Sequence, residues 1–303
     1  MRVLILITIY LIFVNLLLRI NFEPKHRHKL HRRMKKTVFA VFLFLLFAAC
    51  NNHKPSNPVV DSSNPAPPLL NYSVVKVYPH DTSLYTQGLE WVDSSLYEGT
   101  GNYGSSKLLK ERLSDGKAQK ELSLEKSFFG EGITVMHNKV YQLTWKENKV
   151  FVYDASTFKK INELTWPFEG WGLTNNGKEL IVSNGSSNLY FVDPETFRII
   201  RQVGVTDNYG PVALLNELEY ANGSIYANQY ETDYIVKINA TTGKVEGKMD
   251  CSKLLAQSGL NYNPEEYTVN TGYVLNGIAY DSAKNSFYIT GKMWPALFEI
   301  KLN

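Results

Sequence analysis

The sequence predicts an all-β fold, a five-bladed β-propeller whose ring is closed by a strand from near the N-terminus. Three observations support this prediction: a short segment recurs five times, each copy is followed by two strand-like runs, and aromatic residues are abundant. The chain contains 19 Tyr and 15 Phe, many of which alternate with polar residues. Such alternation is typical of half-buried strands, and no segment has the periodicity of a long amphipathic helix.

The recurring segment is a glycine or polar residue followed by an apolar residue, and it predicts the first strand of each blade. Its copies begin at Gly88, Gly132, Gly172, Glu217 and Gly277, at intervals of 44, 40, 45 and 60 residues. A period near 40–45 residues built from short strands is typical of propellers. The long last interval contains an insertion, residues 251–272, which we expect to begin with a short helix and to lie as a loop or flap on one face.

The remaining strands follow each copy in order. The second strands are predicted at SLYEGT (95–100), KVYQLTW (139–145), LIVSNG (180–185), SIYANQY (224–230) and SFYITGKMW (286–294). The third strands are predicted at KLLKERL (107–113), KVFVYD (149–154), NLYFVD (188–193), YIVKIN (234–239) and ALFEIKL (296–302). Residues 72–78 precede the first unit and have no blade of their own. We expect them to pair with the last blade and remove the open edge of the ring.

Residues 1–49 have the pattern of a leader. Residues 2–18 are almost wholly apolar, and a second apolar run at 37–49 ends in Leu-Phe-Ala-Ala before Cys50. The segment starting at Met34, MKKTVFAVFLFLLFAAC, contains basic, apolar and small residues in the order of a complete secretory signal. It resembles a bacterial lipoprotein signal. We therefore expect a true start at Met34, a lipid on Cys50, and an exported protein anchored to a membrane in the periplasm or at the cell surface; a transmembrane helix at 2–18 is the alternative.

Residues 50–70 are rich in Asn, Ser and Pro and predict a disordered tether, which leaves 71–303 as one folded domain. Nine of the 32 Lys and Arg and one of the 29 Asp and Glu lie in residues 1–49, so the remainder holds 23 bases and 28 acids, a net charge of −5. This charge argues against a nucleic acid partner. Cys251 has no partner if Cys50 carries lipid, and we interpret it as a small structural residue. A closed propeller needs no second subunit, so we expect a monomer.

The first strand of every blade lines the central channel, so residues beside these strands converge although they are distant in sequence. These residues are Gln87, Glu131, Trp171, Asn216, Glu217 and Asn276. A carboxyl group buried among aromatic rings has a raised pKa, which suits a group that transfers protons. Residues 50–303 keep only three histidines and contain no His-x-His or His-Glu-x-x-His motif, so we expect no metal and no cofactor.

Motifs from all five blades resemble one family. They are HDTSLYTQGLEW (80–91), FFGEGITV (128–135), VYQLTWKENKVFVYD (140–154), GWGLTNNGKELIVSNGSSNLYFVDP (170–194), LNELEYANGSIYANQYETD (215–233), VLNGIAYD (274–281) and ITGKMWPALFEIKL (289–302). Together they closely resemble the plant and bacterial type of glutaminyl-peptide cyclotransferase, a metal-independent enzyme that converts N-terminal Gln of peptides or proteins to pyroglutamate and releases ammonia.

The resemblance implies a site as well as an activity. It places the catalytic acid on Glu131 and the substrate-binding residues on Tyr85, Gln87, Phe129, Trp145, Trp171, Asn216, Tyr230 and Lys292. Tyr85 stands where phenylalanine is usual and Tyr230 where tryptophan is expected, so both departures keep an aromatic wall. Without the resemblance, Lys292 would be interpreted as a solvated surface lysine.

Two other functions remain open from the residues alone. A propeller can also be a non-catalytic surface module that binds peptides or glycans. A lyase or hydrolase acting on sugars would need paired carboxylates, which Glu217 and Glu219 imitate because they alternate in one strand. An acid inside an aromatic box favours the cyclotransferase, since a binding module needs no group that moves a proton.

Overall fold

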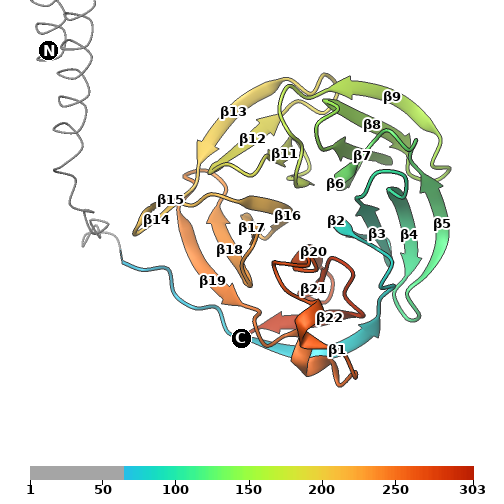
Figure 1. Ribbon diagram of the computed structural model, residues 1–303. Helices are drawn as coiled ribbons and strands as arrows, with labels where there is room; N and C mark the ends of the chain where they lie inside the picture. Colours follow the sequence, from blue (N-terminus) through green and yellow to red (C-terminus); the bar gives the residue numbers. More distant parts are fainter. Residues whose placement is uncertain (1–64) are drawn as a thin grey trace, which may run out of the picture. The chain divides into compact units, whose positions relative to one another are not determined.

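The computed structural model describes residues 65–303, which form five four-stranded antiparallel sheets around a central axis (Figure 1). The predicted five-bladed propeller is confirmed. The predicted leader, the start at Met34, the lipid site at Cys50 and residues 50–64 of the tether lie outside the described residues. Within residues 65–303, no helix is long and apolar enough to cross a membrane.

Four of the blades follow sequence order from the axis outward. Blade one consists of β2 (Thr86–Val92), β3 (Ser95–Thr100), β4 (Lys107–Arg112) and β5 (Lys117–Ser123). Blade two consists of β6 (Gly130–Met136), β7 (Lys139–Thr144), β8 (Lys149–Asp154) and β9 (Lys160–Thr165). Blade three consists of β10 (Leu173–Asn175), β11 (Leu180–Ser183), β12 (Asn188–Val192) and β13 (Ile199–Gly204). Blade four consists of β16 (Leu215–Ala221), β17 (Ser224–Gln229), β18 (Tyr234–Asn239) and β19 (Val245–Asp250), preceded by the hairpin β14 (Thr206–Asp207) and β15 (Gly210–Pro211).

The fifth blade joins the two ends of the domain. It consists of β20 (Leu275–Asp281), β21 (Ser286–Gly291), β22 (Ala296–Leu302) and, as its outer strand, β1 (Tyr72–Pro79). The β1–β22 pairing runs antiparallel along the whole of both strands, with a bulge between Val74 and Lys76. The predicted closing strand is therefore confirmed.

The boundary of the domain differs from the expected one. The Leu70 amide donates to the Lys248 carbonyl (2.7 Å), and the Lys248 amide donates to the Pro68 carbonyl (2.9 Å). The outer strand β19 offers unpaired backbone groups, and Leu70 adds an apolar side chain that packs against the core. Residues 68–70, which we expected in the tether, therefore have backbone that pairs with blade four.

The sequence indicated three strands per unit; it predicted β1, the outer strand of blade five, but missed the outer strands of the other four blades. The outer strands β5, β9 and β13 are largely solvated; Ile161 and Ile199, for example, are 52% and 44% exposed. A strand at the rim of a blade buries little on either face, so its residues carry no apolar alternation to detect.

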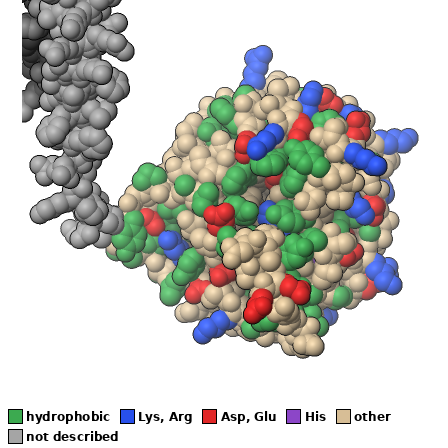
Figure 2. All heavy atoms as spheres, in the orientation of Figure 1, with side chains coloured by type: hydrophobic (Ala, Val, Ile, Leu, Met, Phe, Trp, Pro, Cys, Tyr) green, Lys and Arg blue, Asp and Glu red, His purple; other side chains and the backbone are tan. Residues whose placement is uncertain are grey.

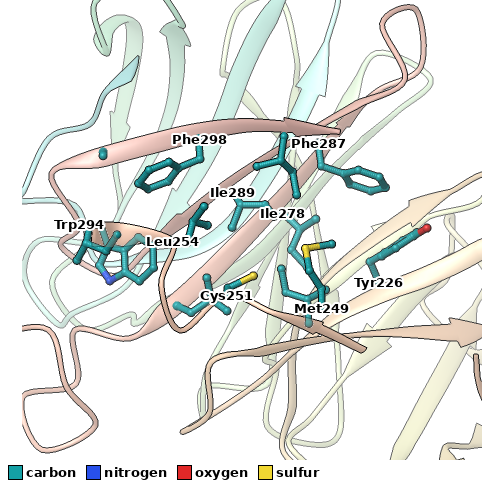
Figure 3. Packing of buried hydrophobic residues seen from close by; sticks show 14 of the residues in the cluster. Tyr226, Met249, Cys251, Leu254, Ile278, Phe287, Ile289, Trp294 and Phe298 are labelled. Carbon is teal, nitrogen blue, oxygen red and sulfur yellow. The ribbon is translucent and has the colours of Figure 1, made fainter. Parts of the chain in front are cut away.

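The core is divided among the interfaces between neighbouring blades, with one buried apolar cluster at each. The cluster between blades four and five is shown in Figure 3, where Tyr226 and Met249 face Phe287 and Ile289. The insertion extends it: residues 251–272 form two short 3₁₀ helices, η1 (Leu255–Ser258) and η2 (Pro264–Glu266), and Cys251 and Leu254 pack into the cluster. Cys251 thus occupies a structural position, as interpreted from sequence.

The first strands approach one another closely along the axis. A Cβ atom on Gly88, Gly132 or Gly172 would collide with the backbone of the next blade. Glu217 stands at the equivalent place in blade four and carries its carboxylate into the channel. There its two oxygens accept the backbone N–H groups of Leu89 in blade one (3.1 Å) and Ile278 in blade five (2.8 Å). Close packing and this crossing side chain narrow the channel.

Candidate active site

A cavity of about 250 Å³ lies on the axis at one face of the propeller. Every blade contributes at least one lining residue. The lining contains one residue that the sequence did not place in the site, Asn102, and all nine that it did. These nine are Tyr85, Gln87, Phe129, Glu131, Trp145, Trp171, Asn216, Tyr230 and Lys292.

The floor of the cavity comes from one repeated position, the residue immediately before the recurring segment in each blade. These equivalent residues are Gln87, Glu131, Trp171, Asn216 and Asn276; the first four line the cavity, whereas Asn276 is fully buried and donates from Nδ2 to Gln87 Oε1. Five strands that start side by side around an axis bring this position together five times. The fold therefore produces the convergence, and the residue types decide the chemistry.

A second repeated feature positions three of the residues around the floor. In three blades, the residue just after the second strand donates its backbone N–H to the carbonyl of the residue two before the floor position. The Trp145 amide donates to the Phe129 carbonyl (3.0 Å) and the Tyr230 amide to the Leu214 carbonyl (2.8 Å). The Lys292 amide makes the same bond to the Val274 carbonyl (2.9 Å). Trp145, Tyr230 and Lys292 are thus equivalent residues of three blades, and each is directed by the same local geometry.

Gln87 is the centre of the polar network. Its Nε2 donates to Glu131 Oε1 (3.2 Å), while its Oε1 accepts from Lys292 Nζ (2.6 Å) and from Asn276 Nδ2 (3.2 Å). Two donors at one oxygen fix the orientation of the amide. Gln87 therefore joins the carboxylate and the ammonium group of the pocket without bringing them into direct contact.

Burial shifts the pKa of both ionisable groups of the pocket in the direction that favours their uncharged forms. Glu131 is 4% exposed, and burial raises its pKa well above the usual range; the Lys292 ammonium opposes this rise, while Glu169 and Glu147 add to it. Lys292 is 2% exposed, and burial lowers its pKa to about 8, against the attraction of Glu131. Its Nζ also lies over the rings of Tyr85 (4.5 Å) and Tyr230 (5.2 Å), which favours the charged form. Burial therefore favours the protonated carboxyl of Glu131, and Lys292 can lose its proton near pH 8.

Aromatic rings enclose these polar groups. Phe129 lies with its ring centre 5.5 Å from that of Trp145, and Trp171 lies 5.6 Å from Tyr230. The two tryptophans share one acceptor, because Glu169 Oε2 accepts from Trp145 Nε1 (2.8 Å) and from Trp171 Nε1 (3.3 Å). Glu169 therefore fixes the orientation of two walls at once.

Sequence reasoning missed Glu169 and Asn102. Glu169 occupies in blade three the position that Phe129 occupies in blade two, so an alignment of the repeats, Phe-Gly-Glu-Gly against Glu-Gly-Trp-Gly, contains a signal for it. Asn102 follows the end of β3 with a positive φ of 86°, a conformation that asparagine tolerates better than most residues. The Gly-Asn pair at 101–102 is the only local signal for it.

Two of the five equivalent residues have a buried side-chain oxygen without a hydrogen-bond partner among residues 65–303. Asn216 is 3% exposed, and its side-chain oxygen has no hydrogen-bond partner within residues 65–303. A buried amide oxygen without a partner is unusual. The side-chain oxygen of Asn276, the equivalent residue of blade five, is unpaired in the same way.

Other sequence interpretations resolve differently. Lys292 is buried and hydrogen-bonded, so the solvated surface position that its neighbours suggested was wrong. Glu217 and Glu219 do not line the cavity; Glu219 accepts the Tyr280 amide (2.9 Å), and both carboxylates tie neighbouring blades together. They are not placed as a pair that flanks a substrate.

In the part of the chain from residue 65 onward, no three His, Cys, Asp or Glu side chains are grouped as metal ligands.

The face seen in Figure 2 has hydrophobic and acidic side chains around a central hollow. Loops on the cavity side of the blades contribute exposed apolar residues. Tyr103 (52% exposed) packs edge-on against Phe129 of the cavity wall, at 5.4 Å between ring centres, and its hydroxyl donates to Glu147 (2.7 Å). Tyr103 therefore lies at the edge of the cavity, beside Phe129.

Comparison with known proteins agrees with this arrangement. Residues 42–302 match the model of a family described as glutamine cyclotransferase. A glutaminyl-peptide cyclotransferase of Arabidopsis thaliana is 38% identical over 235 residues, which cover 76% of this chain and 70% of the plant protein. The crystal structure of a glutaminyl cyclase from Myxococcus xanthus is similar with a TM-score of 0.71 at 33% identity, covering 78% of this chain and 98% of that one.

Proposed function

This chain belongs to the glutamine cyclotransferase family of enzymes, and we propose that it converts the N-terminal glutamine of peptides or proteins to pyroglutamate with Glu131 as the group that transfers the proton. The observation that supports this role is the position of Glu131, buried on the cavity floor with its carboxylate held by Gln87. The cavity volume of about 250 Å³ suits one amino-acid side chain better than a large ligand.

The reaction is a displacement within one residue. The α-amine attacks the side-chain carboxamide carbon, the bond between that carbon and the amide nitrogen breaks, and ammonia leaves. Because nucleophile and electrophile belong to the same residue, the main task of the site is to hold the side chain in a folded, reactive shape, which can lower the barrier by several kcal/mol. The walls formed by Phe129, Trp145, Trp171 and Tyr230 are suited to this and exclude water.

Glu131 moves one proton in this scheme. Its carboxylate takes a proton from the attacking amine and, as the carboxylic acid, delivers it to the departing nitrogen, so the proton count is balanced. Burial raises the pKa of Glu131 above that of an ordinary carboxyl group, which favours the acid form that delivers the proton. The oxygen of the carboxamide becomes negative in between, and the Lys292 ammonium and Asn216 Nδ2 are the donors in this cavity that can stabilise it, by about 2–4 kcal/mol if preorganised.

Ammonia release tests this function. Full-length protein is incubated with a Gln-initiated peptide, and ammonia and the cyclised product are measured by a coupled assay and by mass spectrometry. We expect one ammonia per pyroglutamyl product, with no change on adding EDTA. If several Gln-initiated peptides bind to the folded protein but none is converted, the non-catalytic surface module would be favoured instead.

We also propose that the protein is exported and carries a lipid on Cys50, from the order of basic, apolar and small residues before that cysteine. The test is expression with a labelled fatty acid, followed by detergent partition. We expect label and detergent-phase partition in the wild type and neither in Cys50→Ala. Label that persists in Cys50→Ala would overturn the proposal.

A further inference from the structure

Outside the cavity, a buried cluster of titratable groups lies behind the segments that deliver Lys292 and Gln87. We propose that His80 and Glu98 form an ion pair whose role is to position Lys292 and Gln87 for the reaction. This inference rests on the proposed function for its catalytic meaning. His80 is a positioning residue, since it does not line the cavity.

The hydrogen bonds give His80 a positive charge. Its Nδ1 lies 2.7 Å from the Trp294 carbonyl oxygen, and its Nε2 lies 3.1 Å from Glu98 Oε2. A carbonyl and a carboxylate only accept, so both ring nitrogens must carry hydrogen. Burial lowers the pKa of His80, but Glu98 and the Trp294 carbonyl more than offset it, so the net pKa is raised.

The surroundings keep one negative charge beside this positive one. The side chains of His80 and Glu98 are 3% and 0% exposed, so neither is screened by water. Burial and the proximity of Glu98 raise the pKa of Glu111 to about 10, which keeps Glu111 neutral, while Asp81 is the remaining acid near His80. A buried pair of this kind holds its geometry because losing either partner leaves an unpaired charge.

Each member of the pair holds one catalytic segment. His80 binds the carbonyl of Trp294, two residues after Lys292, and the Trp294 ring is fixed in the apolar cluster beside Leu254 and Phe298 (Figure 3). Glu98 accepts from Thr86 Oγ1 (2.7 Å), one residue before Gln87. The Met293 amide donates to the Leu84 carbonyl (2.8 Å), which joins the two segments directly.

The consequence is a fixed contact between Lys292 Nζ and Gln87 Oε1 (2.6 Å), with Lys292 only 2% exposed. If the pair is removed, the turn after β21 can move outward and Lys292 can reach water. The pKa of Lys292 would then rise from about 8 towards the ordinary value for lysine. A lysine held only by its own contacts would show no such response.

The first test measures the pKa of Lys292 by NMR, which does not require turnover. Full-length protein labelled with [¹³Cε]lysine is titrated by NMR, with Lys292→Met identifying the resonance, in wild type, His80→Ala, His80→Gln and Leu108→Ala. Leu108 is a fully buried core residue of blade one and serves as a control for destabilisation. We expect the Lys292 midpoint to rise by about one pH unit or more in His80→Ala and to be partly restored in His80→Gln, whose amide can donate to the Trp294 carbonyl.

Kinetics give the second readout. We expect kcat to fall about 10- to 100-fold in His80→Ala, with a smaller change in KM. Wild-type activity should decline as Lys292 loses its proton above about pH 8, and in His80→Ala this decline should shift to higher pH together with the Lys292 midpoint. An unchanged Lys292 midpoint in folded His80→Ala, or a change equal to that in Leu108→Ala, would overturn the positioning role. Absence of ammonia release by the wild type would refute the proposed function alone, because the NMR titration does not depend on turnover.

Discussion

Two groups of buried acids lie along the axis of this propeller, and only one faces a cavity. Burial raises the pKa of Glu131 and of Glu217 well above the usual range. Glu131 contacts the side chain of Gln87 and lines the cavity, whereas both oxygens of Glu217 accept backbone N–H groups from other blades. A raised pKa therefore does not by itself mark a catalytic acid; the partners and the access decide the role.

Glu90 and Glu219 extend the structural group. Glu90 accepts the Val135 amide of blade two (2.8 Å), and Glu219 accepts the Tyr280 amide of blade five (2.9 Å). We refer to Glu90, Glu217 and Glu219 as the channel acids. They compensate backbone groups where the first strands meet, so we expect their loss to affect stability, and loss of Glu131 to affect turnover.

Matched substitutions at Glu131 and Glu217 give the largest expected contrast. We expect Glu131→Gln to lower kcat/KM by about 10³-fold, because the proton carrier is lost, with little change in Tm. Glu217→Gln leaves one backbone N–H facing an amide NH₂, so we expect a loss of about 1–3 kcal/mol in the free energy of unfolding. Its kcat/KM should stay within about threefold of the wild type. Ammonia release and thermal unfolding measure both, and a reversed pattern would refute the division of roles.

Lys292 tests the charge at the cavity end. We expect Lys292→Met to lower kcat about 10²-fold, since a donor to the developing oxyanion is lost. Burial lowers the pKa of Lys292 to about 8, so the ammonium is present below that pH and is lost above it. Wild-type kcat should therefore fall as pH rises through about 8, and Lys292→Met should lack this decline. A decline that persists in the variant would assign it to another group.

The channel acids predict a pH dependence of stability. Burial raises the pKa of Glu90 from 4.5 to about 7 in the folded protein. The folded state then binds a proton more tightly than the unfolded state, so this contribution is full below about 4.5 and is lost as pH rises through about 7. Between pH 4.5 and pH 7, we expect the free energy of unfolding of Glu90→Gln to fall by about 1–3 kcal/mol less than that of the wild type. Chemical denaturation at several pH values measures it, and an identical slope would exclude Glu90 as the cause.

Glu169 is expected to have the smallest effect, because it acts through the tryptophans. Glu169→Gln keeps one acceptor oxygen for two indole N–H groups and removes a charge near Glu131. We expect KM to rise about three- to tenfold with kcat changed less, as the walls lose their fixed orientation. Glu195→Gln is the control, since that carboxylate is 70% exposed on the opposite face. Equal KM values for the two variants would contradict the orienting role.

The sequence determined the number of blades, the order of their inner strands and the closing strand. It could do so because five equivalent units repeat the same apolar pattern, and the pattern of a buried strand is local. The outer strands β5, β9 and β13 and the contacts of residues 68–70 were missed for the converse reason. They are held mainly by backbone hydrogen bonds, which almost any side chain permits.

For the site, the residues alone identified the floor positions, and the family resemblance supplied the wall residues and Lys292. Only the tertiary structure decided how these groups are used. Gln87 lies between Glu131 and Lys292, Glu169 accepts from two tryptophans, and Glu217 accepts backbone N–H groups of two other blades. The residues adjacent to them in the sequence predict none of these contacts. The physical reason is that a pKa, a desolvated charge and a hydrogen-bond partner depend on groups from other blades, and those are placed only when the ring closes.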